Sequence, residues 1–342
     1  MVETQTNKVV RRRQAESLPT IWLVMETYQV GIEQCLEGTG LSFEEVASGK
    51  AELSLDQEYA LYRNLLRLSN DPLLGLKLGA RFGPQTLGIF GYALLSSKTI
   101  RSVVDISIRF FDLSYSHFSN SAVESEEFIE VRFDFRYNLP EDLVQVFSDR
   151  DTRAAVTLGE MLGMQETLLS EVHLVHTDYK NLKVYEEHFG CPVLLGKERN
   201  CLFIPRHLGD LELPWSNDHA MKACIESCQE LLADLRSTES VRTKVVDQLI
   251  KRPGQFMAIE QIAENLGTSA RSLRRKLQQE DTSYQEIVKD MRLELARQYL
   301  KDRLTVEQVA ELLGYSETSA FSRAFKTWTG SPPQEYRGAR GF

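Results

Sequence analysis

Apolar residues recur at the spacing of two short helices between residues 305 and 327. One apolar face of the first helix is formed at positions i, i+3, i+4 and i+7 by Val306, Val309, Ala310 and Leu313. Gly314 follows this face and marks a turn. In the second helix, Phe321 and Phe325 lie four residues apart on the inner edge. The pattern predicts a helix-turn-helix unit.

A second copy of this pattern begins 47 residues earlier in the chain. Six positions match at that constant offset: Ile259, Ile262, Ala263, Leu266, Gly267 and Ser269. After the turn the offset is 48, because the later copy has one additional residue there. The sequence therefore predicts two copies of one supersecondary unit, near residues 258–280 and 305–327.

The starts of the two copies differ in their capping residues. Thr305 with Gln308 predicts a capping box, whereas Ala258 stands at the equivalent position of the first copy. A lost cap costs about 1 kcal/mol, so we expect a weaker helix start there. Between the copies, Ser283 to Leu300 predicts a long helix with an apolar stripe that packs against both.

Each predicted second helix carries a polar row opposite its apolar face. In the first copy the candidate contacts are Ser269, Arg271, Arg274, Arg275 and Gln278. In the second copy they are Thr318, Ser319, Ser322, Arg323 and Lys326. Arginine binds guanine edges bidentately in the major groove, and shorter polar side chains reach other bases or phosphates. The rows therefore predict double-stranded DNA as a partner.

Within the rows, Arg271 and Arg274 are expected to contact base edges. Arg275 and Arg323 occupy the same place in the repeat and are expected to play similar roles. Lys326, one turn farther along, is expected to meet phosphate. The alternative is that these side chains are solvated or pair with carboxylates such as Glu280.

The segment from about Val241 to Arg337 resembles the DNA-binding domain of the AraC/XylS family of bacterial transcription regulators. Its densest match is GYSETSAFSRAFKTWTGSPPQEYR, residues Gly314 to Arg337. The resemblance implies two helix-turn-helix units joined by a long helix, promoter DNA as the ligand, and RNA polymerase as a partner, as for an activator.

Upstream of these units, helical and strand periods are mixed, which predicts an α+β domain. The expected helices are Ile21 to Leu36, Leu55 to Leu68, Ile100 to Phe111 and Leu143 to Leu162. The expected strands are Phe128 to Arg136, Val172 to Val175, Val193 to Leu195 and Cys201 to Ile204. The predicted fold is thus an α+β N-terminal effector domain followed by an all-α DNA-binding domain.

Two blocks of this region resemble the effector domain called arabinose-binding in regulators similar to the ornithine and arginine regulators. They are Asn70 to Ile100 and His188 to Pro205. The resemblance implies a small-molecule effector whose identity stays open, because members respond to chemically different molecules. Phe128 to Phe135 and the nearby Tyr115 are candidates for a partly apolar cavity, with packing in the core as the alternative.

A stripe at coiled-coil spacing joins the two regions. Its members are Met221, Cys224, Ile225, Cys228, Leu231, Leu232 and Leu235. The stripe fits the seam of a homodimer or packing within the chain. The apolar-free run from Arg236 to Ser240 predicts a linker. We therefore expect a flexible basic tail at 1–17, containing Arg11 to Arg13, an effector and association domain at 18–235, and a DNA-binding domain at 236–342.

The net charge of −9 at first argues against a nucleic-acid partner. From Ser237 onward, however, 17 Lys and Arg stand against 14 Asp and Glu, while the rest has 23 against 35. Basic residues are thus enriched where DNA is expected to bind. No apolar run approaches the roughly 20 residues that span a bilayer, and the start lacks a signal-peptide core, so no membrane and a cytoplasmic location are expected.

Residues with catalytic or metal-binding spacing do not emerge. The five cysteines contain no CxxC pair, and the six histidines show no HExxH spacing. We expect no cofactor, no metal and no enzyme activity. Two alternatives are an enzyme or alkyl acceptor fused to a DNA-binding domain, and a constitutive DNA-binding protein with an association domain. The zinc-holding type of alkyl acceptor is disfavoured because Cys35 stands alone in the first 190 residues.

Overall fold

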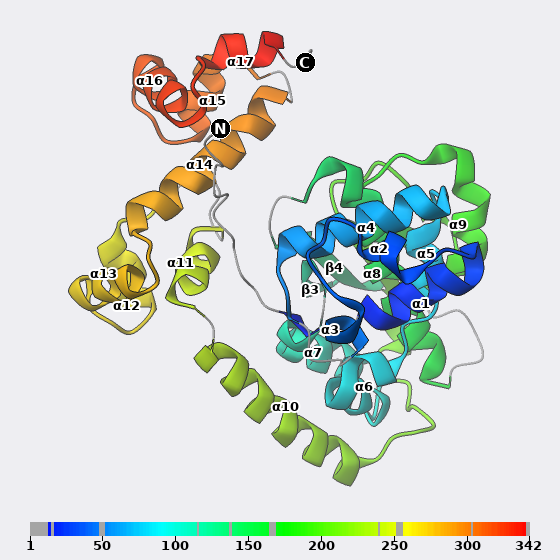
Figure 1. The fold of residues 1–342 in the computed structure, drawn as a ribbon. Coiled ribbons are helices and arrows are strands. Elements are labelled where there is room, and N and C mark those ends of the chain that lie inside the picture. Colours follow the sequence, from blue (N-terminus) through cyan, green and yellow to red (C-terminus); the bar gives the residue numbers. More distant parts are fainter. Residues whose placement is uncertain are drawn as a thin grey trace. The chain divides into compact units, whose positions relative to one another are not determined.

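The computed structural model describes residues 13–14, 17–47, 52–114, 116–136, 139–163, 169–238, 240–250, 256–301 and 304–339. These residues form two compact units (Figure 1), the first ending at Thr238 and the second following it. The sequence placed a domain boundary between residues 235 and 236. The predictions for Arg11, Arg12 and Tyr115 lie outside the described residues.

A five-stranded sheet lies in the first unit, in the order β3-β4-β7-β5-β6. Its strands are β3 (Phe118–Glu124), β4 (Phe128–Phe135), β5 (Glu171–His173), β6 (Val193–Leu194) and β7 (Asn200–Pro205). Neighbouring strands are antiparallel except for β5 and β6, which are parallel. In β4 the alternation is confirmed, because Ile129, Val131 and Phe133 are buried. Phe135, at its end, is exposed instead.

Helices surround this sheet. They are α1 (Ser17–Tyr28), α2 (Ile32–Leu36), α3 (Phe43–Ala47), α4 (Leu55–Ser69), α5 (Leu74–Gly79), α6 (Gly88–Leu95), α7 (Ile100–Phe110), α8 (Glu141–Met161), α9 (Leu182–Phe189) and α10 (Asp218–Thr238). Short 3-10 turns are η1 (Pro84–Leu87), η2 (Phe111–Leu113), η3 (Tyr179–Asn181) and η4 (Arg206–Leu208), and a small ribbon pairs β1 (Arg13–Gln14) with β2 (Glu52–Leu53). The prediction of a single helix from Ile21 to Leu36 is wrong. Gln29 adopts a φ of 54°, which ends α1 before α2 begins.

Glycines allow two pairs of helical segments to approach closely. On α5, a Cβ at Gly75 would lie 2.5 Å from the carbonyl oxygen of Val146 on α8. A Cβ at Gly91 on α6 would lie 2.1 Å from the carbonyl oxygen of Pro84. Because neither position has room for a side chain, glycine lets these helices pack at backbone contact. Gly91 therefore has a packing role between α6 and η1.

Buried histidines are part of polar networks in the first unit. His176 Nε2 lies 2.7 Å from Asp149 Oδ1, and the hydroxyl of Tyr185 donates to Asp149 Oδ2 at 2.9 Å. Burial raises the pKa of Asp149, while the bond to His176 opposes that effect. His117 lies 3.1 Å from a carboxylate oxygen of Glu58. His117 and His176 therefore each lie close to a carboxylate inside the first unit.

The stripe on α10 packs within its own unit. Cys224, Cys228 and Leu232 are buried against side chains of α6 and α7. Leu231 and Leu235 remain 48% and 43% exposed. The structure thus uses most of the stripe for intrachain packing. The predicted linker is also shorter than expected, because α10 continues to Thr238.

The second unit contains seven helices among its described residues: α11 (Val241–Ile250), α12 (Ile259–Asn265), α13 (Ala270–Gln279), α14 (Tyr284–Lys301), α15 (Val306–Leu312), α16 (Thr318–Thr329) and α17 (Pro333–Ala339). Its apolar residues form two clusters. One contains side chains of α11, α12, α13 and the first half of α14. The other contains side chains of the second half of α14 with α15 and α16. The expectation that the connecting helix packs against both copies is confirmed.

Replacing Gly79 should test the close contact between α5 and α8. Its added Cβ would lie 2.4 Å from the carbonyl oxygen of Arg150, so Gly79→Ala must push the helices apart. We expect a loss of about 1–3 kcal/mol in the free energy of unfolding, measured by urea denaturation. Gly31→Ala is the control, because its nearest atoms are side-chain atoms at 3.6 Å, and it should cost less than about 1 kcal/mol. Equal losses in both variants would contradict the packing argument.

Candidate DNA-binding surface and effector cavity

Each helix-turn-helix turn contains a glycine with a left-handed backbone. Gly267 between α12 and α13 has a φ of 64°, and Gly314 between α15 and α16 has a φ of 74°. Thr305 and Gln308 form the predicted capping box, with hydrogen bonds of 3.2 and 2.8 Å. At Ala258 only one half of the capping box is present, in which the Ala258 N–H donates to the side-chain oxygen of Gln261 at 3.3 Å. Both copies therefore turn in the same way, although the first starts with one cap fewer.

Buried side chains fix which face of each second helix is outward. Leu273 and Leu277 of α13 are buried in the first cluster, and Phe321 and Phe325 of α16 are completely buried in the second. The ring centroids of Phe321 and Phe325 lie 5.6 Å apart. Since these residues hold one face of each helix against its core, the opposite polar face points to solvent.

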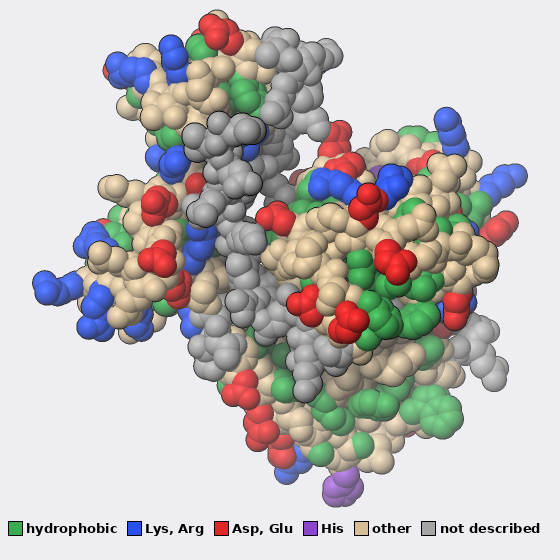
Figure 2. All heavy atoms as spheres, viewed as in Figure 1, with side chains coloured by type: hydrophobic (Ala, Val, Ile, Leu, Met, Phe, Trp, Pro, Cys, Tyr) green, Lys and Arg blue, Asp and Glu red, His purple; other side chains and the backbone are tan. Residues whose placement is uncertain are grey.

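The predicted rows lie on those outward faces. The exposed members are Ser269, Arg271, Arg274, Arg275 and Gln278 in the first copy, and Ser319, Arg323 and Lys326 in the second. Thr318 and Ser322 are half-buried. Figure 2 shows Lys and Arg side chains gathered over α12 and α13 and acidic side chains along α10. The structure thus presents all ten residues on the two second helices or at their starts.

Two members of the first row already have partners in the protein. The Ser269 hydroxyl accepts a hydrogen bond of 3.2 Å from the N–H of Ser272 and so caps α13. Arg274 donates to Glu260 at 2.8 Å, and both side chains are more than half exposed. An exposed pair of this kind contributes at most about 1 kcal/mol, so Arg274 is only weakly held.

The sequence offered Glu280 as an ion-pair partner for the arginines of the rows, but in the structure Glu280 has a different role. Its two carboxylate oxygens accept hydrogen bonds of 2.7 and 2.9 Å from the N–H groups of Val241 and Arg242. The carboxylate therefore caps the start of α11, where the helix dipole favours negative charge. Within the described residues, the side chains of Arg271 and Arg275 have no ion-pair partner.

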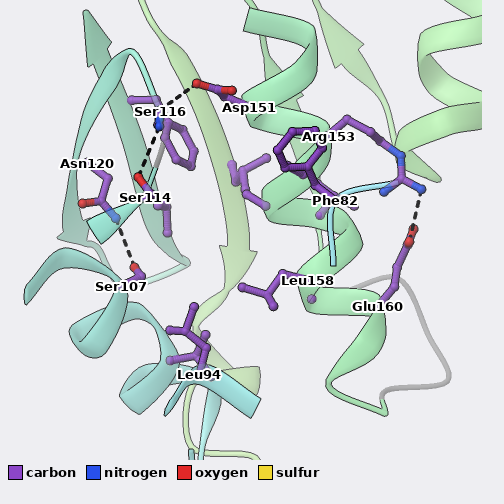
Figure 3. Close-up of a pocket in the computed structure, with 18 of the residues that line it drawn as sticks. Phe82, Leu94, Ser107, Ser114, Ser116, Asn120, Asp151, Arg153, Leu158 and Glu160 are labelled. Carbon is purple, nitrogen blue, oxygen red and sulfur yellow. Dashed lines mark hydrogen bonds and ion pairs between the residues drawn. The ribbon is translucent and has the colours of Figure 1, made fainter. Parts of the chain in front are cut away.

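A cavity of about 600 Å³ lies in the first unit between the helices and the sheet. Its wall is mainly apolar and includes Phe90, Leu94, Val104, Val131, Phe133, Leu158, Leu202 and Ile204. These residues come from α6, α7, α8 and strands β4 and β7 (Figure 3). The volume is that of a site for a small molecule. Of the strand predicted to form a cavity, Val131 and Phe133 line it.

Polar groups occupy separate positions on the cavity wall. The amide of Asn120 donates to the Ser107 hydroxyl at 3.1 Å. Ser116 donates to Asp151 at 2.7 Å, as Figure 3 shows. Farther along α8, Arg153 donates to Glu160 at 3.1 Å. An apolar occupant would therefore meet hydrogen-bonding groups at more than one place.

The buried side chain of Arg150 on α8 has several close partners. Arg150 Nε donates to Asp151 at 2.6 Å, and Arg150 Nη1 donates to the hydroxyl of Tyr62 at 2.6 Å. Burial by itself lowers the pKa of Arg150, but the attraction of Asp151 and Tyr62 outweighs it and the pKa is raised. Its guanidinium also lies 4.7 Å from the ring centroid of Phe147. Arg150 therefore stays charged beside the cavity.

The five cysteines lack the properties of reactive thiols. All five are buried and free. Burial raises the pKa of Cys191 and Cys228 to about 11 and that of Cys201 to about 12. These thiols are therefore protonated near neutral pH and are poor nucleophiles. Among the described residues, no group of three or more His, Cys, Asp and Glu side chains could hold a metal, and no helix is long and apolar enough to cross a membrane.

Two helix-turn-helix units with outward polar rows, together with a separate unit that contains a cavity, define a DNA-binding transcription regulator. Comparison with known proteins specifies the family. Residues 30–213 match the family described as the arabinose-binding domain of AraC transcription regulators, N-terminal part. Residues 262–339 match a helix-turn-helix domain family. The chain belongs to the AraC family of transcription regulators, as its motifs predicted.

The similarity to known transcription regulators extends over most of the chain. An uncharacterized HTH-type transcriptional regulator of Mycobacterium tuberculosis is 31% identical over 294 residues, which are 83% of each chain. The ornithine utilization regulator of Pseudomonas aeruginosa is 31% identical over 274 residues, or 80% of each chain. The structure of transcriptional regulator CdpR from Pseudomonas aeruginosa is 24% identical, covers 94% of this chain and 97% of its own, and has a TM-score of 0.49. The five-stranded sheet and helices of the first unit, the seven helices described in the second, and the two family matches confirm the predicted fold class, an α+β effector domain before a helical DNA-binding domain.

Sequence reasoning missed most of the cavity. Its wall is assembled from segments that are far apart in the chain, and β3, which supplies Asn120, was not predicted. One signal was present: Asp149, Arg150, Asp151 and Arg153 lie within one stretch of five residues in an otherwise amphipathic helix. Successive residues of a helix point about 100° apart, so these charges spread around α8. Asp149, Arg150 and Arg153 are accordingly buried.

Proposed function

We propose that this protein binds promoter DNA through the polar rows of α13 and α16, and that a small molecule in the cavity of the first unit controls that binding. The observation that carries the proposal is the repeat of one outward polar row in two helix-turn-helix units of the same chain. Two reading helices cover two segments of major groove without a second protein.

The rows divide into base-reading and phosphate-binding positions. Arg271 and Arg274 are assigned to base edges, and Arg275 and Arg323 to similar contacts at equivalent places of the repeat. Arg274 must leave Glu260 to do so, which its exposure makes inexpensive. The hydroxyls of Thr318 and Ser319 lie in the first turn of α16, where N–H groups and hydroxyls suit phosphate. Ser269, Gln278 and Ser322 complete the surface.

Constitutive DNA binding and enzyme activity are the competing functions. A cavity with this volume and a partly polar wall favours an effector over a domain that only associates. The buried, protonated cysteines disfavour an alkyl acceptor. We therefore assign no catalysis to the chain, place it in the cytoplasm with its promoter DNA, and infer RNA polymerase as its partner at the promoter.

Alanine variants should separate base reading from phosphate binding. Arg271→Ala and Arg323→Ala should each remove about 1–3 kcal/mol of discrimination at one or two base pairs, because a bidentate arginine–guanine pair is lost. Lys326→Ala should weaken binding to all sequences alike and reduce the salt slope by about one unit. Selection from randomised DNA, followed by titration at several salt concentrations, measures both effects.

Lys276→Ala is the matched control, because Lys276 is exposed on α13 outside the polar row. Its base preference should equal that of the native protein. If folded Arg271→Ala and Arg323→Ala proteins also keep the native preference, the assignment of the reading faces is wrong.

Blocking the cavity should remove the response to the effector. Ser107 lines the cavity, so the ring of a Ser107→Phe variant should occupy the space a ligand needs. A ligand at 100 times its Kd stabilises a protein by about 2.7 kcal/mol, and this gain should be lost. The measurement is the thermal shift, and the change in promoter footprint, caused by a low-molecular-weight cell extract.

Ser121→Phe is the control for this experiment. Ser121 is exposed on β3, one residue from Asn120, and does not line the cavity. It should respond to the extract as the native protein does. A full response in folded Ser107→Phe would place the effector elsewhere, and a native protein that never responds would favour constitutive binding.

We also propose that the full-length chain forms a homodimer in which α10 takes part. The support is the exposure of Leu231 and Leu235, which lie on a coiled-coil stripe whose other members pack within the unit. Leu231→Asp should shift the sedimentation coefficient at micromolar concentration toward that of a monomer, because an interfacial charge would be desolvated. Gln229→Asp, on an exposed position of the same helix, should not. A native protein that sediments as a monomer at every concentration would remove the proposal.

A further inference from the structure

One arginine on α14 lies between the two helix-turn-helix units. The first half of α14 contributes Ile287 and Val288 to the first apolar cluster, and the second half contributes Ala296 and Leu300 to the second. Arg292 stands between these two sets in the sequence. It therefore occupies the stretch of helix where one core ends and the next begins.

The guanidinium of Arg292 contacts an aromatic ring from each side. Its central carbon lies 4.6 Å from the ring centroid of Phe256 and 4.9 Å from that of Tyr315. Both distances fall within the range of cation–π attraction, which strengthens when the cation is withdrawn from water. Arg292 Nε is buried and has no hydrogen-bond partner among the described residues. The two rings therefore contribute to holding this side chain in place.

The two rings pack on different helix-turn-helix units, both within the second compact unit. Phe256 precedes α12 and packs against the first cluster. Tyr315 lies in the turn between α15 and α16, and its ring centroid is 5.6 Å from that of Phe321 in the second cluster. A movement of either helix-turn-helix unit about α14 would separate Arg292 from one of its rings. The contact thus joins the turn before α16 to the segment before α12.

The relative orientation of the two helix-turn-helix units matters for DNA binding. Two reading helices fit one face of a duplex only at a defined separation, about 34 Å for successive turns. The 18 residues of α14 supply about 27 Å of helix, but a helix fixes distance better than it fixes the rotation of a unit packed on its side. A contact shared by both units restricts that rotation.

We propose that Arg292 is a positioning residue, which locks the two helix-turn-helix units in one relative orientation and so makes the protein select the spacing between the two DNA segments it reads. The inference rests on the proposed two-segment DNA binding. Arg292 itself need not touch DNA for this role. An arginine that only fills the core would change stability without changing spacing preference.

The test uses the full-length protein and an operator that the native protein selects from randomised DNA. Affinity is measured for that operator and for versions with one base pair inserted or removed between the two contacted segments. Arg292→Ala should weaken binding to the selected operator by about tenfold, yet lose much less than the native protein on changing the spacing. Arg292→Lys, which keeps the charge but not the planar stack, should be intermediate.

Lys289→Ala removes a charge from an exposed position of the same helix and should keep native spacing preference. If Arg292→Ala does not fold, Tyr315→Leu removes one ring while keeping an apolar side chain, and should show the same relaxed spacing. Folded variants that lose affinity equally at every spacing, or lose none, would overturn the inference. A native protein whose footprint contains a single contacted segment would instead refute the two-segment binding on which it rests.

Discussion

Neither helix-turn-helix unit has enough apolar surface to close a core alone, so both depend on packing against α14. The first helices, α12 and α15, have seven residues each, a length at which an isolated helix is not stable in water. Ile287 and Ala296, on the two halves of α14, are completely buried in separate clusters. One helix therefore stabilises two small cores, and the same packing fixes where the two polar rows point. Folding and reading geometry have a common cause in this unit.

In the first unit, α8 lies between the packed helices and the cavity. One side of it meets the glycine-containing helix α5 at backbone contact, and another lines the cavity with Arg153 and Leu158. The charges on α8 are retained inside the unit because each finds a partner: Arg150 pairs with Asp151, and Asp149 with His176. A buried charge without a partner would cost several kcal/mol, so these networks hold α8 in one register beside the cavity.

The features that sequence reasoning found depend on residues close together in the chain. The helix-turn-helix copies follow from helical period, a turn glycine and the Thr305 cap, all of which act within one or two helical turns. The cavity depends on segments that meet only in the folded state. In β3, Ser119, Asn120 and Ser121 are polar in succession, so the strand has no alternating signal and was missed. The break at Gln29 was missed because a positive φ is uncommon at a non-glycine residue and has no clear signal in the sequence.

The cavity shares side chains of α6 with the packing of α10, the last helix of the first unit. Phe90 and Leu94 of α6 line the cavity, and the same two side chains belong to the cluster that buries Cys224 and Cys228 of α10. That helix continues without interruption to Thr238, where the first unit ends. A ligand that contacts Phe90 or Leu94 therefore acts on residues that hold the last helix before the DNA-binding unit. It changes DNA binding only to the extent that it binds one packing arrangement of α6 and α10 more tightly than another.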